Sequence, residues 1–356
     1  MPKLTLLVAS ALLLAACGSA GPSAPTQSSA AGVAAQPAPP DSPVTLSVWD
    51  GSTTIQAPLY IAMDRGYLQE QGIEVQAMPI TGAFDAQVPL LATGQLDVGG
   101  GSIVPALFNA VGRGLPLRVT AIGALHTPGR SQLIVARKDL VESGQLKSYA
   151  DLRGKVVGRP TALGIATIAI EKALELGGLT SSDITYLDLP TPDTVVALGN
   201  NKVDVAYMTE PFGTQAIEQG VAVKWHEMAD LVPNHVAAMW AYGSKLLDEQ
   251  PEVGRRFMVA LMHGMRDYED AFGKNKGRAD VVNILVKHTV IKEPALYEKM
   301  QIIAEPASGE FPLDTLQEDY DWLKARGAIQ EPAPALSQVV DTRFVQDALQ
   351  QLGPYQ

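Results

Sequence analysis

The sequence predicts an α/β protein with two lobes of similar construction, followed by a mainly helical C-terminal part. Between residues 44 and 125, short apolar runs alternate with segments of helical periodicity, and the alternation repeats between residues 132 and 242. This pattern is typical of a largely parallel sheet with helices on its faces. From Ser244 onward the pattern is almost entirely helical. A chain of this length can form two lobes with separate cores.

The first lobe is expected to begin with a strand at residues 44–49, because apolar and polar residues alternate there until residues 50–52 interrupt the pattern. A helix is expected at 54–71, closed by Gly72, since glycine commonly ends helices. Further strands are expected at 73–78, 96–98 and 117–125. Further helices are expected at 84–93 and 102–111.

The second lobe repeats this order, with an amphipathic helix at 164–176 that ends at a pair of glycines. Its strands are expected at 132–136, 155–158, 184–189, 203–208 and 223–226. A short echo supports two similar lobes: residues 94–98 and 201–205 both carry a polar residue, an apolar residue, aspartate and valine into a strand. We interpret Asp97 and Asp204 as structural residues at strand entry.

A last strand at 236–242 returns the chain to the first lobe, and helices follow. Pro251 and Pro294 suit the first turn of two of these helices. The helices are expected at 251–272, 278–288, 294–304, 313–326 and 342–352. The expected division is lobe 1 at 44–129, lobe 2 at 130–236, and the return with the C-terminal helices at 237–356. Two connections, near 125–130 and 233–238, would form a hinge.

The N-terminus has the pattern of a lipoprotein signal. Lys3 precedes an apolar run from Leu4, which ends in Leu14-Ala15-Ala16-Cys17. Residues 1–16 would be the signal peptide, and Cys17 would carry the lipid (palmitate) that anchors the chain outside the cytoplasm, at the cell membrane. Residues 17–43, rich in Ser, Ala, Gly, Pro and Gln, would form a flexible tether. The alternative is a secretory signal with a chance cysteine; as the single cysteine of 356 residues, Cys17 has no intrachain disulfide partner.

Charge and motifs exclude several classes of function. The formal net charge is −11, from 27 Lys+Arg against 38 Asp+Glu, which disfavours a nucleic-acid partner. The sequence contains no Walker P-loop, no His-Glu-x-x-His, no Gly-x-Ser-x-Gly and no dinucleotide fingerprint. Its five histidines lack metal-ligand spacing. We therefore expect no cofactor, no metal site and no catalytic residues.

Candidate binding residues follow from one rule about open α/β sheets. Ligands bind there beyond the carboxyl ends of the strands, where helix N-termini present free N–H groups. The rule selects residues that end or follow strands in both lobes and on the return crossing, and Tyr60 is added from the first helix. The candidates are Trp49, Asp50, Ser52, Tyr60, Gly101, Ser102, Arg159, Thr161, Thr167, Tyr207, Met208, Glu210, Trp240 and Tyr242.

Several candidates also have a structural explanation, which the sequence leaves open. Trp49 and Trp240 suit a core as well as a cleft, although their shared position at strand ends favours the cleft. Glu210 could cap a helix, and Tyr60 could face the core. Residues 99–101 could serve close helix–strand packing, but three successive glycines also suit a flat ligand lying on the backbone.

Seven segments of the chain carry a resemblance to a known group of proteins. They are APLYIA (57–62), RGYL (65–68), GIEV (72–75), LLATGQLDV (90–98), DLRGKVVG (151–158), VDVA (203–206) and EP (210–211). Together they resemble the solute-binding lipoproteins of ABC importers for sulfonates, taurine, nitrate and thiamine-pyrimidine-like compounds. The resemblance covers residues 44–272. It implies the type II periplasmic binding fold and a monomer that closes two lobes on a small ligand. The partners it implies are an ABC permease and its cytoplasmic ATPase.

The candidate side chains favour one class of ligand. Trp49, Trp240, Tyr207, Tyr242 and Met208 offer aromatic and thioether groups, which suit a planar heterocycle held by stacking. Families similar to this one include binders of riboflavin and of thiamine-precursor pyrimidines. The resemblance therefore favours riboflavin, with such a pyrimidine next.

Two alternatives remain at the level of sequence, besides a ligand-sensing subunit of a membrane receptor, which the sequence does not separate from a transport protein. A sulfonate, taurine or nitrate binder needs cations or several helix N-termini around the anion, and Arg159 could supply one charge. A salt bridge at the surface or between the lobes explains Arg159 slightly better. The second alternative is an enzyme of the thiamine-pyrimidine synthase type, which shares the fold but needs histidine and cysteine chemistry. The one cysteine is assigned to the lipid anchor, and no histidine lies in the strand-end loops, so we expect a binding protein rather than an enzyme.

Overall fold

The structure is a computed structural model that describes residues 43–80 and 84–356. Cys17, the expected signal peptide at 1–16 and the expected tether up to residue 42 lie outside the described residues. In the part of the chain that the structure describes, no helix has both the length and the apolar character needed to span a bilayer.

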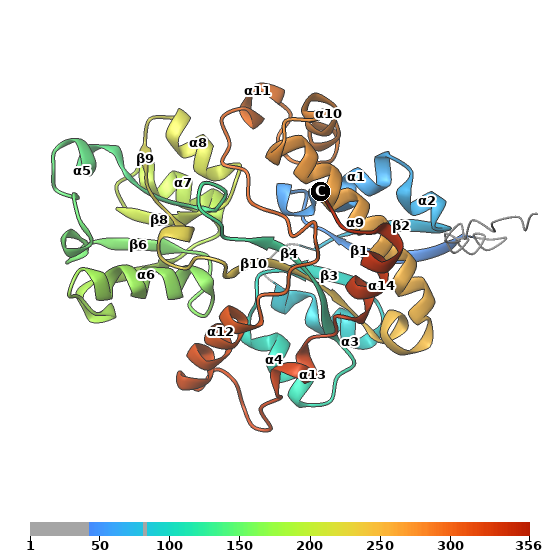
Figure 1. The fold of residues 1–356 in the computed structure, drawn as a ribbon. Helices are drawn as coiled ribbons and strands as arrows, with labels where there is room; N and C mark the ends of the chain where they lie inside the picture. The colour runs from blue at the N-terminus through green and yellow to red at the C-terminus, as the bar shows by residue number, and fades with distance from the viewer. Residues whose placement is uncertain (1–42, 81–83) are drawn as a thin grey trace, which may run out of the picture. The chain divides into compact units, whose positions relative to one another are not determined.

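The first lobe is built on a five-stranded sheet with the order β2-β1-β3-β10-β4 (Figure 1). β1 is parallel to β2 and β3, whereas β10 is antiparallel to both β3 and β4. β10 enters from the second lobe, so it runs against its neighbours, and the sheet is mixed rather than largely parallel. The strands are β1 (Val44–Asp50), β2 (Ile73–Pro79), β3 (Val98–Gly101), β4 (Arg118–Leu125) and β10 (Val236–Tyr242).

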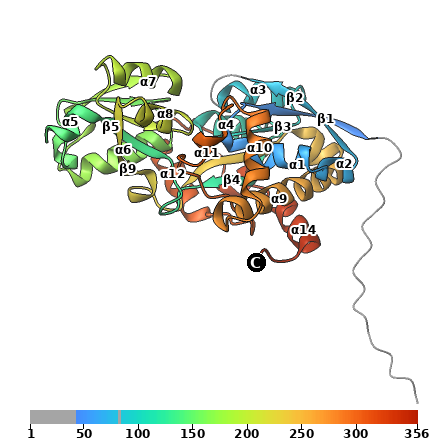
Figure 2. The ribbon, with the colours of Figure 1, turned by 90° about the horizontal axis from the view of Figure 1, so that it is seen from above.

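The second lobe has a sheet of the same construction, with the order β7-β6-β8-β5-β9. Figures 1 and 2 show this lobe beside the first, with helices around its sheet. β6 is parallel to β7 and β8, and β5 is antiparallel to β8 and β9. β5, which enters from the first lobe, thus occupies the place that β10 holds in the first sheet. The strands are β5 (Leu133–Arg137), β6 (Val156–Arg159), β7 (Thr185–Asp188), β8 (Val205–Met208) and β9 (Ala222–Glu227).

Hydrophobic cores cover both faces of the first sheet. One core joins its strands to α1 (Ala57–Asp64), α9 (Pro251–Gly273) and α14 (Arg343–Leu352). The other joins them to α3 (Val88–Thr93), α4 (Pro105–Gly112), α12 (Leu313–Ala325) and α13 (Leu336–Val339). A third cluster adds α10 (Arg278–His288) and α11 (Pro294–Tyr297), and α2 (Tyr67–Glu70) packs beside α9.

The second sheet is covered in the same way. One face packs against α6 (Ile165–Leu176) and α5 (Lys138–Glu142). The other face packs against α7 (Thr191–Gly199) and α8 (Phe212–Glu218). Because side chains of a strand alternate between faces, Tyr207 and Met208 of β8 enter different clusters.

The two aspartates of the sequence echo make equivalent contacts in the two lobes. Asp97 Oδ2 accepts hydrogen bonds from the backbone N–H of Ser47 (2.8 Å) and from Lys245 Nζ (3.1 Å). Asp204 accepts from the backbone N–H of Val156 (2.9 Å) and from Arg137 Nη1 (3.1 Å). Each carboxylate therefore ties the second strand in the sheet order, β1 or β6, to a cation at the far end of the incoming antiparallel strand. These contacts agree with the interpretation of both residues as structural.

Two extended crossings join the lobes and bond to each other. The backbone N–H of His126 donates to the carbonyl of His235 (3.1 Å), and Asn234 donates back to the carbonyl of His126 (2.7 Å). His126 is fully buried, and its Nδ1 lies 3.0 Å from Ser131 Oγ. Burial lowers the pKa of His126 to about 3, with a smaller contribution from His235. The paired crossings occupy the position expected for a hinge.

Three predicted elements differ from the observed ones. The helix expected at 54–71 is a 3-10 turn followed by α1 and α2, because Gly66 adopts a left-handed φ of 81° between the two helices. The helix expected at 294–304 ends at Tyr297, and Ala304 instead forms a bridge with Leu125. The third strand is Val98–Gly101 rather than 96–98, so the glycines lie within the strand.

Candidate ligand-binding site

A cavity of about 410 Å³ lies between the lobes, at the sheet edges where β1, β3, β6, β7 and β8 end. Its lining is mostly uncharged, with aromatic, aliphatic, hydroxyl and glycine residues. Lobe 1 contributes Trp49, Thr53, Ile55, Phe84, Gln87, Gly100, Gly101, Ser102 and Val104. Lobe 2 contributes Pro160, Thr161, Asp188, Leu189, Pro190, Thr191, Tyr207 and Thr209.

The indole of Trp49 is held against glycine backbone on the lobe 1 side. A Cβ added at Gly51 would lie 2.8 Å from Trp49 Cζ2, and one added at Gly100 would lie 3.3 Å from the same ring. Trp49 Nε1 donates to the carbonyl of Ile80 (3.2 Å), so its polar atom is satisfied. With 7% of the residue exposed, Trp49 offers the cavity a fixed aromatic surface.

Gln87 completes this wall by pairing with the edge of β3. β1 pairs with β3 only at Val48 and Val98, which leaves the backbone of Gly100 without a strand partner on that side. The Gln87 carboxamide replaces the strand: its Oε1 accepts from the Gly100 N–H (2.9 Å) and its Nε2 donates to the Gly100 carbonyl (2.8 Å). Gln87 is buried, so this pairing satisfies polar groups that would be costly to leave without partners.

Tyr207 is the main aromatic side chain of the lobe 2 wall. Its hydroxyl donates to Gln132 Oε1, and both residues are buried. Burial raises the pKa of Tyr207, so the phenol stays neutral and acts as a hydrogen-bond donor. Trp49 and Tyr207 thus give the cavity one aromatic side chain from each lobe beside Phe84.

The single charged residue of this lining, Asp188, is already neutralised within lobe 2. Arg159 Nε donates to Asp188 Oδ1 (2.7 Å), and Arg159 Nη1 donates to Thr167 Oγ1 (3.1 Å). The same guanidinium lies 3.7 Å from the ring centre of Tyr186. Arg159 therefore forms a salt bridge inside its own lobe and does not line the cavity, as its structural explanation predicted.

Two helices begin at the cavity. Val104 is the N-cap of α4, and Thr191 is the first residue of α7 after its N-cap Pro190. Helix N-termini carry partial positive charge and suit oxygen acceptors. The site thus combines an aromatic surface with dipoles that fit carbonyl oxygens or a small anion.

Residues 53–270, more than half of the sequence, match the family described as NMT1/THI5 like. The chain belongs to the NMT1/THI5-like family.

Two relatives of the chain have names of different kinds: one is named as a binding protein and the other as an enzyme. Riboflavin-binding protein RibY of Chloroflexus aurantiacus is 26% identical over 363 residues, which cover 96% of this chain and 97% of RibY. The 4-amino-5-hydroxymethyl-2-methylpyrimidine phosphate synthase of Aspergillus parasiticus is 28% identical over 134 residues, 38% of this chain and 36% of that enzyme. The match to the binding protein thus extends along the whole chain, whereas the match to the synthase is confined to a part.

Solved structures show the same fold. The ligand-binding component of an ABC-type import system from Staphylococcus aureus superposes with a TM-score of 0.69 at 14% identity, covering 86% of this chain and 99% of that one. The alkanesulfonate-binding protein SsuA from Xanthomonas axonopodis pv. citri gives a TM-score of 0.65 at 17% identity, covering 85% and 99%. The expected type II periplasmic binding fold is therefore confirmed for this family member.

Five predicted site residues meet at the cavity: Trp49, Gly101, Ser102, Thr161 and Tyr207. Their roles toward a ligand stay predictions. Thr167 lies one step behind the lining, because its hydroxyl donates to the carbonyl of Thr161 (3.2 Å).

Asp50, Ser52 and Tyr60 form a separate group behind the loop that follows β1. Asp50 Oδ1 accepts from the backbone N–H of Ser52 (2.8 Å) and from the hydroxyl of Tyr60. Tyr60 is buried and stacks on His288 with 4.9 Å between ring centres. Burial, assisted by Asp50, raises the pKa of Tyr60. This group is absent from the cavity lining given above and holds the loop in place.

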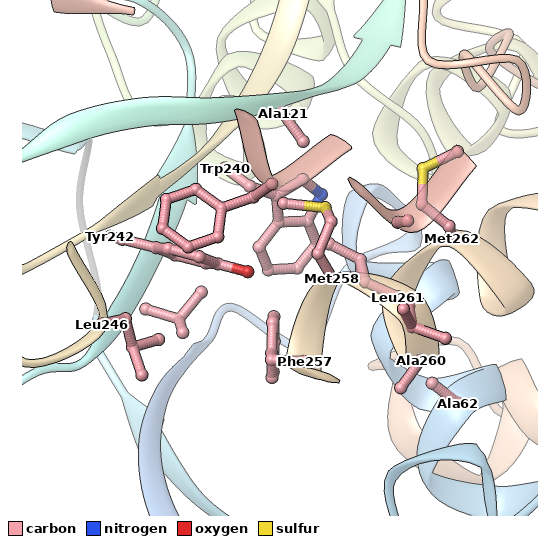
Figure 3. Packing of buried hydrophobic residues seen from close by; sticks show 14 of the residues in the cluster. Ala62, Ala121, Trp240, Tyr242, Leu246, Phe257, Met258, Ala260, Leu261 and Met262 are labelled. Carbon is pink, nitrogen blue, oxygen red and sulfur yellow. The ribbon is translucent and has the colours of Figure 1, made fainter. Parts of the chain in front are cut away.

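The prediction that Trp240 and Tyr242 line the cleft is wrong for two reasons. Because β10 is antiparallel to β3, Tyr242 pairs with Val98, at the end of β3 away from the cavity. Trp240 pairs with Gly100 beside the cavity, but its side chain enters the core that contains α9. Both side chains are buried in the core against Phe257 and Met258 of α9 (Figure 3). The strand-end rule applies to parallel strands, and the sequence pattern did not reveal that this strand is antiparallel.

Met208 and Glu210 are also displaced from the cavity lining. Met208 is fully buried and packs on the α7 and α8 side of β8. Glu210 accepts hydrogen bonds from Thr214 N–H (3.0 Å), Thr214 Oγ1 (2.9 Å) and the Gln301 N–H (3.0 Å). Its capping contact with Thr214 is the structural explanation that the sequence allowed. Burial raises the pKa of Glu210.

Sequence reasoning missed several lining residues. The strand-end rule, applied to the strand that ends near Leu189, would have identified Pro190 and Thr191. Gln87 and Phe84 follow no such rule, because they approach β3 from a neighbouring helical segment. No local sequence pattern identifies Gln87 or Phe84 as a residue of the cavity lining.

Proposed function

We propose that this chain is the extracytoplasmic solute-binding lipoprotein of an ABC importer, and that it closes its lobes on riboflavin or a related planar heteroaromatic compound. The observation that carries the proposal is the cavity between the lobes, whose aromatic walls suit an uncharged ring system and whose described lining residues include no Lys or Arg. Its volume of about 410 Å³ falls in the range of small-molecule sites. The full-length similarity to RibY supports riboflavin among such compounds.

The ring of the ligand would lie against Trp49 and the backbone of β3. Stacking on a fixed indole gains affinity without ordering a mobile side chain. Ring carbonyl oxygens would face the start of α4 or α7, and hydroxyl groups of the ligand would bond to Thr161, Ser102 and Thr209, which line the cavity. Closure of the lobes would bury the ligand, and the closed form would dock on a permease.

An alkanesulfonate or nitrate ligand is the second candidate, favoured by the two helix N-termini at the cavity. Against it, Arg159 is committed to Asp188 and Thr167. A thiamine-precursor pyrimidine would use the same aromatic surface as riboflavin. A synthase activity has less support, because no histidine lines this cavity. Within residues 43–80 and 84–356, no cluster of three His, Cys, Asp or Glu side chains could hold a metal ion.

Thermal unfolding of the refolded, ligand-free chain tests the ligand class. Riboflavin, an aminopyrimidine, taurine, an alkanesulfonate and nitrate are each added in excess. A ligand at 100 times its Kd stabilises by about 2.7 kcal/mol, which corresponds to roughly 5–10 °C in Tm. The proposal expects this shift with riboflavin. A shift confined to taurine, the alkanesulfonate or nitrate would replace it by the anion-binding function.

The lipid anchor has its own test. Expressed with its N-terminus, the chain should fractionate with membranes, and Cys17→Ser should release it, because one acylated cysteine is the proposed attachment. Retention of the Cys17→Ser chain in the membrane fraction would contradict this part of the proposal.

A further inference from the structure

α12 belongs to lobe 1 by its packing. Its apolar face contributes Leu316, Tyr320 and Leu323 to a core on the first sheet. Tyr320 packs edge-on against Phe108 of α4, with ring centres 5.0 Å apart. α12 also contacts the second crossing, because His235 Nδ1 lies 2.8 Å from Asp319 Oδ1.

The other side of α12 contacts lobe 2. Trp322 Nε1 donates to Glu171 Oε2 of α6 (3.0 Å), and Arg326 Nη2 donates to the same oxygen. Trp322 and Arg326 are one helical turn apart, and the guanidinium lies 3.7 Å from the Trp322 ring centre. Figures 1 and 2 both show α12 beside lobe 2. We call Glu171, Trp322 and Arg326 the clasp.

The clasp lies near side chains that support the cavity wall. Ser181 donates to the other carboxylate oxygen of Glu171 (3.2 Å), which fixes the carboxylate within lobe 2. The charge of Glu171 acts on Tyr186, whose pKa is raised chiefly by burial. The Tyr186 ring supports Arg159, which holds Asp188 in the cavity lining. Contacts therefore run from Tyr186 through Arg159 to the cavity, and Glu171 acts on the first of these residues through its charge.

We propose that the clasp is a conformational latch by which the C-terminal part holds the two lobes together and slows release of the ligand. Rotation at the crossings moves α6 relative to α12, so the clasp must break when the lobes separate. A carboxylate that accepts both an indole N–H and a guanidinium has a charge-assisted geometry, stronger than an ordinary surface ion pair. The proposal rests on the proposed function only for its ligand, since the latch itself is a property of the lobes.

Distances between the lobes test the latch without any ligand. The full chain with Cys17→Ser receives spin labels at Glu142→Cys in lobe 2 and Lys276→Cys in lobe 1, both exposed. Pulsed electron paramagnetic resonance then measures the label separation. Glu171→Gln should increase the population with the longer separation about fivefold, because it removes the charge but keeps the shape. Trp322→Phe, which removes only the Nε1–H donor, should act in the same direction.

Glu175→Gln is the matched control. Glu175 lies one turn further along α6, is exposed and pairs only with Lys172 of the same helix. It should leave the separation unchanged. If Glu171→Gln and Trp322→Phe both behave like Glu175→Gln, the latch is refuted. Should Glu171→Gln fail to fold, the Trp322→Phe result decides.

Riboflavin is the probe for the ligand arm, measured by stopped-flow fluorescence. Glu171→Gln should raise its dissociation rate about fivefold and leave the association rate nearly unchanged, whereas a purely structural defect would lower the binding amplitude at saturating riboflavin and leave the dissociation rate of the chains that bind unchanged. If wild-type chain does not bind riboflavin, the proposed function fails, while the label distances still decide the latch. An unchanged dissociation rate in a chain that binds riboflavin would overturn the link between clasp and ligand release.

Discussion

The two lobes share one framework but present different chemistry at the cavity. Both sheets place the incoming antiparallel strand fourth in order, and in both an aspartate ties the second strand, β1 or β6, to a cation. When the registers are aligned on the pairs Val48–Val98 and Val157–Val205, Trp49 corresponds to Gly158 and Gly100 to Tyr207. Each lobe therefore contributes one aromatic side chain from this pair of strands, but from the opposite strand of the pair, and Phe84 adds a second aromatic ring in lobe 1. Buried contacts maintain the same arrangement of strands in both lobes, whereas the residues at the strand ends differ between the lobes.

The aromatic surface of lobe 1 should carry most of the affinity. Trp49→Ala is expected to raise the Kd for riboflavin about 30-fold or more, because a buried aromatic anchor commonly accounts for about 2 kcal/mol or more. Trp225→Ala, which removes a lobe 2 tryptophan packed on Tyr149 and away from the cavity lining, is the control. Fluorescence titration measures both. Equal effects would mean that Trp49 has no special role.

The crossings between the lobes should make the folding stability depend on pH, because His126 is buried there. The folded-state pKa of His126 is about 3, below its ordinary value of 6.5. Its stabilising contribution is thus complete above pH 6.5 and is lost as pH falls toward 3, since only the unfolded chain binds the proton. Between pH 7 and pH 5, His126→Gln should lose about 2 kcal/mol less stability than wild type. Urea unfolding of wild type and of His126→Gln at both pH values measures this difference.

The equivalent aspartates test how far the shared framework extends. Asp97→Asn and Asp204→Asn should each lower the free energy of unfolding by about 1–2 kcal/mol, because each weakens hydrogen bonds to a backbone N–H and a cation. Asp97 should have the larger effect, since its side chain is 4% exposed against 17% for Asp204. Asp139→Asn, at an exposed ion pair with Arg137, should change stability by less than about 0.5 kcal/mol. A large loss of stability in only one of the two variants would show that the two aspartates are not structurally equivalent.

The lobe 2 network should have the smallest effect on a neutral ligand. Arg159→Gln is expected to weaken riboflavin binding by less than about fivefold, because Arg159 supports Asp188 and Thr167 without lining the cavity. Calorimetric titration measures the change. Complete loss of binding would instead indicate that Arg159 contacts the ligand, as an anion-binding protein would require.

The period of apolar residues was sufficient for most strands and long helices and for the α/β class, while the type II periplasmic binding fold was implied by the family resemblance. β10 was predicted at 236–242 and is found at Val236–Tyr242. Its direction depends on the return from lobe 2, which no local pattern encodes, so Tyr242 was misplaced. Trp240 was misplaced because its side chain enters the core rather than the cavity. The helix expected at 294–304 failed for a similar reason: Gln301 and Ala304 bond to Glu210 and Leu125, far away in sequence.

The site was predictable only where parallel strands end. Trp49, Thr161 and Tyr207 lie at such ends and were found. Gln87 reaches the cavity because β1 separates from β3 after one residue pair, and this separation becomes visible only in three dimensions. Arg159 lies at the end of a strand, as the sequence indicated. Its salt bridge with Asp188, which the sequence did not indicate, keeps its charge within lobe 2.

The most direct test of the account is an equilibrium titration of the ligand-free chain with riboflavin, followed by flavin and tryptophan fluorescence, with an alkanesulfonate as competitor. The account predicts saturation at one riboflavin per chain, quenching that is lost in Trp49→Ala but retained in Trp225→Ala, and no displacement by the alkanesulfonate. Absence of riboflavin binding, or its displacement by the alkanesulfonate at equal concentration, would contradict the conclusion that this cavity is built for an uncharged planar ring.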